Sequence, residues 1–280
     1  MIQTICICGA GTMGSGIAQV CATAGYHTIL FDVNAEMLIK GRLAISKGLQ
    51  VLADKQKLSP EEKTNILERI KYTSDTNDCM ADVVIEAIVE KLDVKASLFN
   101  QLTAINHSDV LFATNTSSLS ITALQSKIRC PERVVGMHFF NPAPVMKLVE
   151  VIKGEHTNDI AVEAIYELTK SLGKTPVLCK DSPGFIVNRV ARPYYLEAMK
   201  LVEQGIATFE TVDAVLEASG FKMGPFKLMD LIGLDINYAV SNIVWDALGK
   251  PERLQPSILQ KEKVDACDLG RKTGRGFYSY

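Results

Sequence analysis

The chain has 280 residues, of which 47% are hydrophobic and 22% are charged, and its formal net charge is -2 at pH 7. These values indicate an ordinary globular protein of one large or two moderate domains, with no sign of nucleic-acid binding. No apolar run approaches the roughly 18 to 20 residues that cross a bilayer, and a strand expected to begin at Ile2 leaves no room for a signal peptide.

The first expected strand carries two of the seven cysteines of the chain. Cys6 and Cys8 alternate along it, so we expect both side chains on one buried face. The cysteine spacings match no zinc-site or CxxC pattern, and the odd count favours reduced thiols, as in a cytoplasmic protein.

A glycine-rich stretch follows this strand. Residues 9–14, GAGTMG, match the GxGxxG pattern, and Asp32 ends the second expected strand about 20 residues later. Because the glycine pattern lies between an expected strand and an expected helix, it has the context of a dinucleotide-binding site. The glycines permit a tight turn, a close approach of the backbone to a pyrophosphate and tight helix packing. Asp32 can accept hydrogen bonds from a ribose diol. The alternative is a glycine-rich turn with an incidental acid. The residues expected at the cofactor are Gly9, Gly11, Thr12, Met13, Gly14 and Asp32.

Through about residue 152 the sequence predicts alternating strands and helices. Apolar, β-branched runs lie at residues 2–8, 28–31, 82–88, 110–113, 134–139 and 147–152. Ser59, Pro60 and Glu62 form a capping box at one helix start, Asn158 begins another helix, and a last short strand covers residues 175–179. The alternation predicts an α/β fold, with a Rossmann-type mostly parallel sheet covered by helices on both faces.

The last two runs before residue 152 are joined by a short turn at residues 142–144. The turn is too short for a helical crossover, so we expect an antiparallel hairpin that pairs His138 with Glu150 on one face. A histidine beside a carboxylate is the usual construction for a general base, because the carboxylate orients the ring and stabilises the imidazolium. The alternative is a histidine satisfied by an ordinary sheet neighbour. The nearby dinucleotide site favours catalysis.

Ser117 follows the run at residues 110–113 and is expected at the carboxyl end of the sheet, where ligands bind in open α/β folds. It could instead cap the following helix.

From Ser182 onward the sequence predicts helices only. Ser182 and Pro183 are expected to open a helix that runs to about Gln204. Asn188 would lie about one turn into this helix, where asparagine has poor propensity, which invites a functional role. We expect a NAD-binding Rossmann-type domain over residues 1–182 and a helical substrate and dimerisation domain over residues 183–280. Residues 228–234 and 236–240 carry more apolar surface than a small bundle easily buries, which predicts a homodimer.

Seven stretches of the chain together resemble the 3-hydroxyacyl-CoA dehydrogenase family, most closely its stand-alone bacterial 3-hydroxybutyryl-CoA dehydrogenases. They are GAGTMGSGIAQ, VIEAIVE, NTSSLSI, GMHFFNPAPVMKLVEVI, DSPGFIVNR, GPFKLMDLIGLD and GRKTGRGFYSY, in the same order from the first strand to the last residue. The stretch around His138 is highly specific, whereas GxGxxG alone is weak.

The resemblance implies a role for each matching position. His138 would be the catalytic base with Glu150 as its partner, and Ser117 and Asn188 would hydrogen-bond the substrate 3-oxygen. Lys55 matches a coenzyme-A contact, although it could equally be a solvated charge, and a family serine that also contacts coenzyme A is replaced by Gly48. No metal is implied. The positions that match family residues at the nicotinamide dinucleotide are Asp32, Glu90, Lys95, Ser117, Asn141 and Lys272.

The resemblance therefore implies a cytoplasmic, homodimeric 3-hydroxybutyryl-CoA dehydrogenase of short-chain fatty acid or butyrate metabolism, which interconverts acetoacetyl-CoA and (S)-3-hydroxybutyryl-CoA. Asp32 and the lack of a cation at residues 33–36 favour NAD over NADP. One alternative is a related β-hydroxyacid or sugar-acid dehydrogenase of the same architecture. Another is a non-catalytic dinucleotide-binding protein, against which the pair of His138 and Glu150 argues, because such a protein needs no base.

Overall fold

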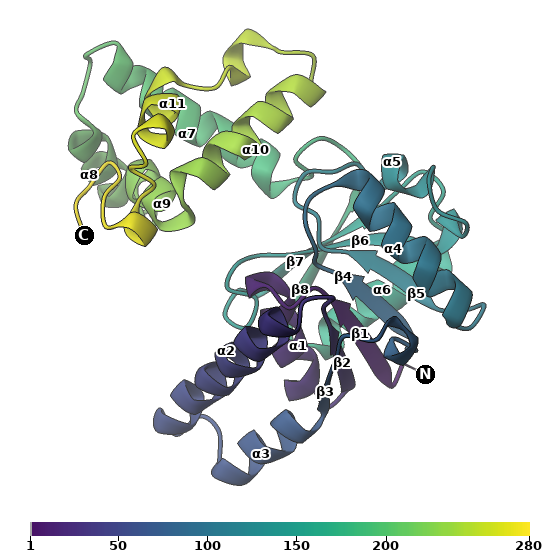
Figure 1. The fold of residues 1–280 in the computed structure, drawn as a ribbon. Helices are drawn as coiled ribbons and strands as arrows, with labels where there is room; N and C mark the ends of the chain where they lie inside the picture. The colour runs from purple at the N-terminus through teal and green to yellow at the C-terminus, as the bar shows by residue number, and fades with distance from the viewer. Residues whose placement is uncertain (1) are drawn as a thin grey trace. The chain divides into compact units, whose positions relative to one another are not determined.

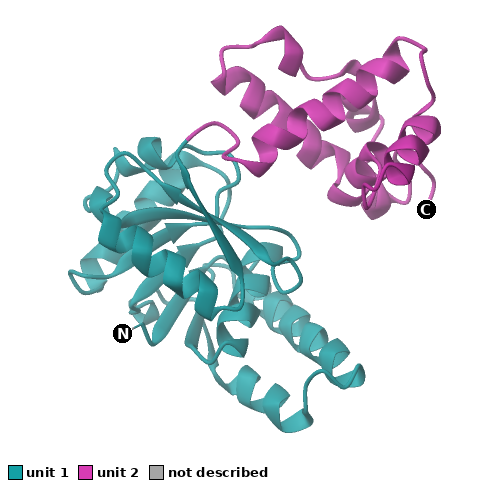
Figure 2. Cartoon of the chain, turned by 180° about the vertical axis from the view of Figure 1, so that it is seen from behind, with its two compact units in different colours: residues 1–181 teal, residues 182–280 magenta. Residues whose placement is uncertain are grey.

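The computed structural model describes residues 2–280. The chain divides between Asp181 and Ser182 into two compact units, one residue before the expected domain boundary (Figure 2). Unit 1 combines strands and helices, whereas unit 2 is built from helices. Within residues 2–280, no helix is both long enough and apolar enough to cross a membrane.

One sheet of eight strands forms the centre of unit 1, in the order β3-β2-β1-β4-β5-β6-β7-β8 (Figure 1). All neighbouring strands are parallel except β6 and β7. The expected Rossmann-type sheet and its antiparallel hairpin are therefore confirmed. The strands are β1 (Thr4–Cys8), β2 (His27–Phe31), β3 (Ile70–Thr73), β4 (Val83–Glu86), β5 (Leu111–Thr114), β6 (Val134–Phe139), β7 (Leu148–Lys153) and β8 (Thr175–Lys180).

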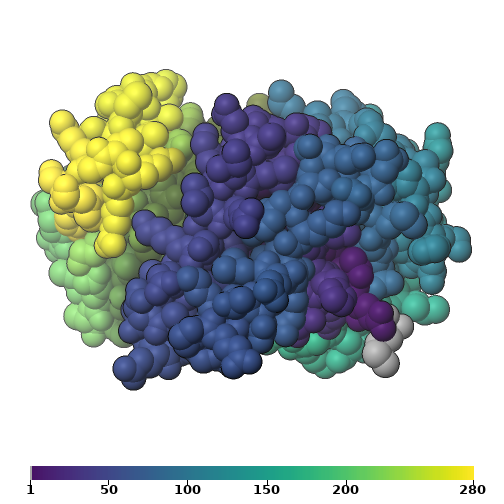
Figure 3. All heavy atoms as spheres, turned by 60° about the horizontal axis from the view of Figure 1, so that its bottom comes forward, coloured from purple at the N-terminus to yellow at the C-terminus, as the bar shows by residue number. Residues whose placement is uncertain are grey.

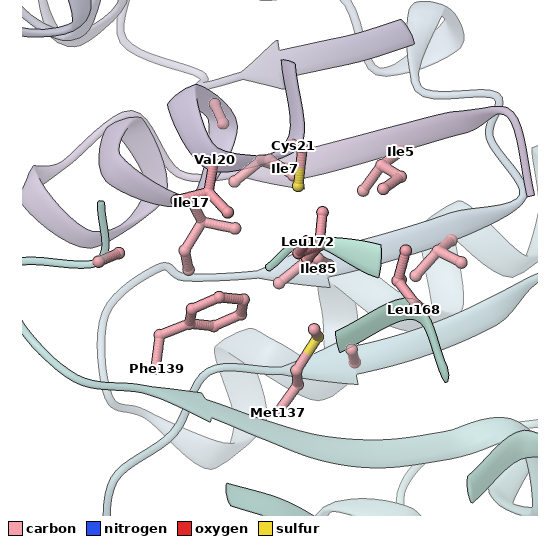
Figure 4. Packing of buried hydrophobic residues seen from close by; sticks show 14 of the residues in the cluster. Ile5, Ile7, Ile17, Val20, Cys21, Ile85, Met137, Phe139, Leu168 and Leu172 are labelled. Atoms are coloured by element: carbon pink, nitrogen blue, oxygen red, sulfur yellow. The ribbon is translucent and has the colours of Figure 1, made fainter. Parts of the chain in front are cut away.

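Helices cover both faces of this sheet, because alternate strand residues are apolar on each side. On one face, Ile17 and Cys21 pack with Ile5 and Ile7 of β1, as Figure 4 shows. On the other face, the ring of Phe99 lies 5.1 Å from that of Phe112 in β5. Helices α1 (Thr12–Thr23), α2 (Ala35–Asp54), α3 (Pro60–Glu68) and α6 (Asp159–Ser171) contribute to the first face, and α4 (Leu92–Ile105) and α5 (Ile121–Gln125) lie on the second.

Several local expectations in unit 1 are confirmed. Ser59 and Glu62 form a capping box at α3, and Asn158 caps α6. Cys6 and Cys8 share a buried face, with their Sγ atoms 3.9 Å apart, and all seven cysteines of the chain are free.

The sequence did not predict β3. This strand has only four residues, lies at the edge of the sheet and carries the exposed Lys71. An edge strand has one unpaired side and needs no continuous apolar run, so its hydrophobic signal is weak.

Unit 2 is a helical domain with its own apolar core, which includes Met199, Phe226, Met229, Leu234 and Val244. Its helices are α7 (Val187–Glu203), α8 (Phe209–Ala218), α9 (Pro225–Ile232), α10 (Leu234–Ala247) and α11 (Ile258–Asp265).

The expected start of α7 at Pro183 is wrong. Gly184 and Phe185 have positive φ angles of 72° and 48°, which a right-handed helix does not allow, so α7 begins at Val187. Asn188 is therefore the second residue of the helix, where Asn is better tolerated than one turn further on.

Two buried carboxylates fasten the C-terminal segment within unit 2. Asp213 accepts a hydrogen bond from the hydroxyl of Tyr278 at 2.8 Å. Asp230 accepts the backbone N–H groups of Phe277 and Tyr278, each at 2.9 Å. These contacts fix the segment that carries Lys272.

Candidate active site

The predicted pair of His138 and Glu150 is present in unit 1. The two residues are direct cross-strand partners on β6 and β7, and His138 Nδ1 lies 2.7 Å from Glu150 Oε2. The side chains are buried, with His138 6% and Glu150 1% exposed. A carboxylate that accepts the Nδ1 proton fixes the ring tautomer, so Nε2 is the atom through which the ring can exchange a proton. This pair can act as a general acid and base.

The hairpin that brings the pair together is closed by backbone bonds in its turn. The N–H groups of Val145 and Met146 both donate to the carbonyl of Pro142, at 2.9 and 3.0 Å. The buried ammonium of Lys174 donates to the carbonyls of Ala143 and Met146, at 2.6 and 2.9 Å. The turn is therefore held on both sides, which secures the strand register that the pair requires.

The loop after β5 carries Ser117 and is attached to the strand of His138. Asn115 Oδ1 accepts the backbone N–H of Phe139, the residue after His138, at 2.8 Å. The alternative in which Ser117 caps the next helix is wrong, because Ser120 is the cap of α5. The sequence placed Asn115 in a polar stretch directly after a buried strand but indicated no role for it.

An ion cluster lies at the carboxyl ends of β4 and β5, in which Lys95 and Glu86 are buried and the side chain of Glu90 is 36% exposed. Lys95 Nζ contacts Glu86 Oε1 at 2.6 Å and Glu90 Oε2 at 3.0 Å. Burial alone would raise the pKa of Glu90, but the ammonium of Lys95 and the hydrogen bonds from Thr116 and Ser117 lower it overall. The structure therefore brings the predicted residues Glu90, Lys95 and Ser117 together. Glu86 was not predicted.

The glycine-rich loop has the geometry that a pyrophosphate requires. Gly9 has a φ of 104°, and a Cβ on Gly14 would lie 1.7 Å from the carbonyl oxygen of Gly9. A Cβ on Gly11 would meet nothing within 4 Å. Gly11 caps α1 without a side chain, and the first turn of α1 contains no acid, so the helix N-terminus is available to a phosphate.

Asp32 is fixed beside this loop. Its Oδ2 accepts the N–H of Ala10 at 2.8 Å, and its Oδ1 accepts the N–H of Asn34 at 2.9 Å. The carboxylate is thus held at the end of β2, where a ribose diol would meet it. Together with the glycines, it gives a donor and acceptor set that fits a dinucleotide.

Gly48 and Lys55 belong to α2 and its C-terminal end. A Cβ on Gly48 would lie 2.8 Å from Oε1 of Gln19 on α1, so a side chain at this position would have to displace that amide group. A groove of about 360 Å³ lies between the same two helices, nearer the glycine-rich loop. Lys55 directly follows α2 and is exposed. The surface of the segment that contains α2 and α3 is seen in Figure 3.

The remaining predicted residues divide between the two units. Asn141 is exposed in the turn after β6. Asn188 and Lys272 belong to unit 2, where Lys272 Nζ pairs with Asp235 Oδ1 at 2.5 Å. Their roles toward a cofactor or substrate stay predictions. Among residues 2–280, no group of three or more His, Cys, Asp or Glu side chains is placed to hold a metal ion.

Two family models match almost the whole chain. The model described as "3-hydroxyacyl-CoA dehydrogenase, NAD binding domain" matches residues 4–182. The model described as "3-hydroxyacyl-CoA dehydrogenase, C-terminal domain" matches residues 184–280.

Individual relatives agree with this match. A protein of Escherichia coli K12 named 3-hydroxyadipyl-CoA dehydrogenase is 47% identical over 100% of this chain, which spans 59% of that protein's length. A probable 3-hydroxybutyryl-CoA dehydrogenase of Deinococcus radiodurans is 42% identical, with 98% of this chain and 99% of that protein covered. The solved structure of an (S)-3-hydroxybutyryl-CoA dehydrogenase from Ralstonia eutropha superposes with a TM-score of 0.95 and 41% identity, covering 100% of this chain and 99% of that one.

Proposed function

Because the chain belongs to the 3-hydroxyacyl-CoA dehydrogenase family and carries its NAD-binding domain, we propose that it interconverts acetoacetyl-CoA and (S)-3-hydroxybutyryl-CoA. The observation that carries the proposal is the buried contact of 2.7 Å between His138 Nδ1 and Glu150 Oε2. A dinucleotide-binding protein without catalysis would need no such base.

His138 handles the proton of the reaction. In oxidation, its Nε2 takes the proton of the 3-hydroxyl group while the hydrogen on the 3-carbon departs as hydride, so that the alcohol becomes a ketone. In reduction, the imidazolium returns a proton to the 3-oxygen. Glu150 stabilises the imidazolium in both directions. When bound, NAD accepts the hydride and NADH donates it.

Ser117 and Asn188 are proposed to hydrogen-bond the 3-oxygen and so to direct it at His138. Glu90, Lys95, Asn141 and Lys272 are proposed to bind the dinucleotide. The exposed ammonium of Lys55 is proposed to contact the coenzyme-A phosphates. These assignments rest on the matching family positions.

A spectrophotometric assay of NADH oxidation tests the proposal. Acetoacetyl-CoA should be reduced efficiently, whereas free acetoacetate and sugar acids should not. A sugar acid turned over at the highest kcat/KM would contradict the proposal, and so would NADH binding without any turnover. The assay also tests 3-oxoadipyl-CoA as a substrate, because the Escherichia coli protein with 47% identity is named 3-hydroxyadipyl-CoA dehydrogenase.

The enzyme is expected to prefer NADH over NADPH by at least about tenfold in kcat/KM, or roughly 1.4 kcal/mol. The fixed carboxylate of Asp32 would repel a 2′-phosphate, and residues 33–36 contain no cation but a second acid, Glu36. Steady-state kinetics with both cofactors at a fixed acetoacetyl-CoA concentration measure this preference. Asp32→Ala should narrow it, whereas Asp54→Ala, at the far end of α2, should leave it unchanged. Equal efficiencies in the wild type would contradict the expectation.

The protein is further proposed to be a cytoplasmic homodimer that associates through unit 2. Leu231, Ile232 and Ile236 are 49%, 39% and 49% exposed, although they lie in a domain with a formed core. Contiguous exposed apolar side chains usually mark an interface. Light scattering at micromolar concentration should give a dimer mass, and Ile236→Lys should shift it toward the monomer. A clean monomer mass for the wild type would refute this expectation.

A further inference from the structure

Glu86 is a fully buried carboxylate to which the proposed mechanism gives no role. It ends β4, and both of its oxygens face donors. Oε1 accepts from Lys95 Nζ at 2.6 Å and from the N–H of Ile88 at 2.7 Å, and Oε2 accepts from Thr114 Oγ1 at 2.7 Å. Burial raises the pKa of Glu86 overall, and the three donors, which favour the ionised form, offset only part of this shift. The carboxylate therefore stands at the end of a central strand and is held by three donors, which come from the neighbouring strand β5, the loop after β4 and helix α4.

Lys95 connects this fixed carboxylate to a second one. Its side chain is 1% exposed, and its ammonium lies between Glu86 and Glu90, at 2.6 and 3.0 Å. Glu86 belongs to a central strand, whereas Glu90 belongs to the loop between β4 and α4. The position of the ammonium is accordingly set by Glu86, and the ammonium in turn holds Glu90.

Glu90 then holds the loop that carries Ser117. Its Oε1 accepts the hydroxyl of Thr116, the backbone N–H of Ser117 at 3.2 Å and the hydroxyl of Ser118 at 3.2 Å. Hydrogen bonds of this kind to an ionised acceptor are stronger than those between neutral groups. A chain of contacts thus runs from the end of β4 through Lys95 and Glu90 to the loop after β5.

We propose that Glu86 is a positioning residue of the dinucleotide site, which acts through Lys95 to hold Glu90 and the Ser117 loop in place. The inference rests on the proposed function for the cofactor-binding roles of Glu90 and Lys95. Without the Glu86 charge, the Lys95 ammonium loses its attachment to the sheet, and Glu90 loses its fixed partner.

A double-mutant cycle on NADH affinity tests this role, because two residues that act through one contact give non-additive effects. Glu86→Gln and Glu90→Gln should each raise the NADH dissociation constant about tenfold. The dissociation constant of the double variant should exceed that of the weaker-binding single variant by no more than about twofold. The NADH dissociation constant is measured by fluorescence without substrate. A failure of acetoacetyl-CoA turnover would therefore count against the proposed function and leave this cycle interpretable.

Asp82→Asn is the matched control. Asp82 directly precedes the same strand at its opposite end, and its carboxylate accepts the N–H groups of Gln3 and Thr4 at 2.7 and 2.8 Å. The Asp82→Asn change takes away one charge far from the carboxyl edge of the sheet, so the NADH dissociation constant should stay within about twofold of the wild type. In the double variant with Glu90→Gln, the two changes in binding free energy should add.

The proposal is overturned if the NADH dissociation constant of Glu86→Gln stays within about twofold of the wild type. It is also overturned if the dissociation constant of the double variant rises by the product of the two single increases. If circular dichroism shows that Glu86→Gln does not fold, Thr114→Val takes its place in the cycle. Thr114→Val removes the hydrogen bond to Glu86 Oε2 but no charge, so it should raise the NADH dissociation constant less than Glu86→Gln does. In the Glu90→Gln background, this increase should disappear.

Discussion

Replacing His138 with alanine is expected to lower kcat by about 10²- to 10⁴-fold, because a positioned general base is lost. NADH affinity should stay within about threefold of the wild type, since His138 lies on β6 and pairs with Glu150, whereas the glycine-rich loop follows β1. Stopped-flow reduction of acetoacetyl-CoA and NADH fluorescence titration measure the two quantities separately.

Glu150→Gln keeps the shape of the partner and removes its charge, so we expect a smaller loss, on the order of 10- to 100-fold. His107→Ala is the control, because His107 is exposed in the loop before β5, at the amino end of the sheet. Near-full kcat in either His138→Ala or Glu150→Gln would show that the pair does not transfer the proton.

Lys95→Met is expected to lower the free energy of unfolding of unit 1 by about 3–5 kcal/mol, the usual cost of breaking a buried ion pair by removing one partner. The variant leaves the carboxylates of Glu86 and Glu90 without the cation that lies 2.6 and 3.0 Å from them. Urea unfolding followed by circular dichroism measures the loss. Trp245, the only tryptophan of the chain, lies in unit 2 and reports that unit separately by fluorescence.

Lys127→Met provides the comparison. Its ammonium lies 2.9 Å from Asp93, but the two side chains are 46% and 86% exposed. Exposed pairs contribute about 0–1 kcal/mol, so this variant should unfold almost as the wild type does. A Lys95→Met protein as stable as Lys127→Met would contradict the interpretation of the cluster as a buried ion pair.

The features predicted from sequence were those that short stretches of chain determine. The register of His138 and Glu150 followed from a turn between two apolar runs, and the glycine-rich loop followed from its spacing and flanking elements. The capping residues Ser59 and Asn158 act on helices that begin one residue later. Each of these signals is local and agrees with the folded environment.

The features that were missed depend on partners far along the chain. Glu86 obtains its position from Lys95 and Thr114, which are 9 and 28 residues away, and nothing in the residues next to it reveals either contact. The start of α7 was misplaced because Gly184 and Phe185 adopt left-handed backbone angles, and Phe does so only under the constraint of its folded surroundings.

The hairpin of β6 and β7 also sets what the protein can tolerate in evolution and engineering. Successive residues of a strand face opposite sides, so a one-residue slip in the pairing would turn His138 and Glu150 to opposite faces. The bonds within the turn and from Lys174 secure that register, so insertions at residues 142–146 would put the pairing at risk. Libraries that seek new acyl groups should therefore keep both the turn and the strand lengths constant.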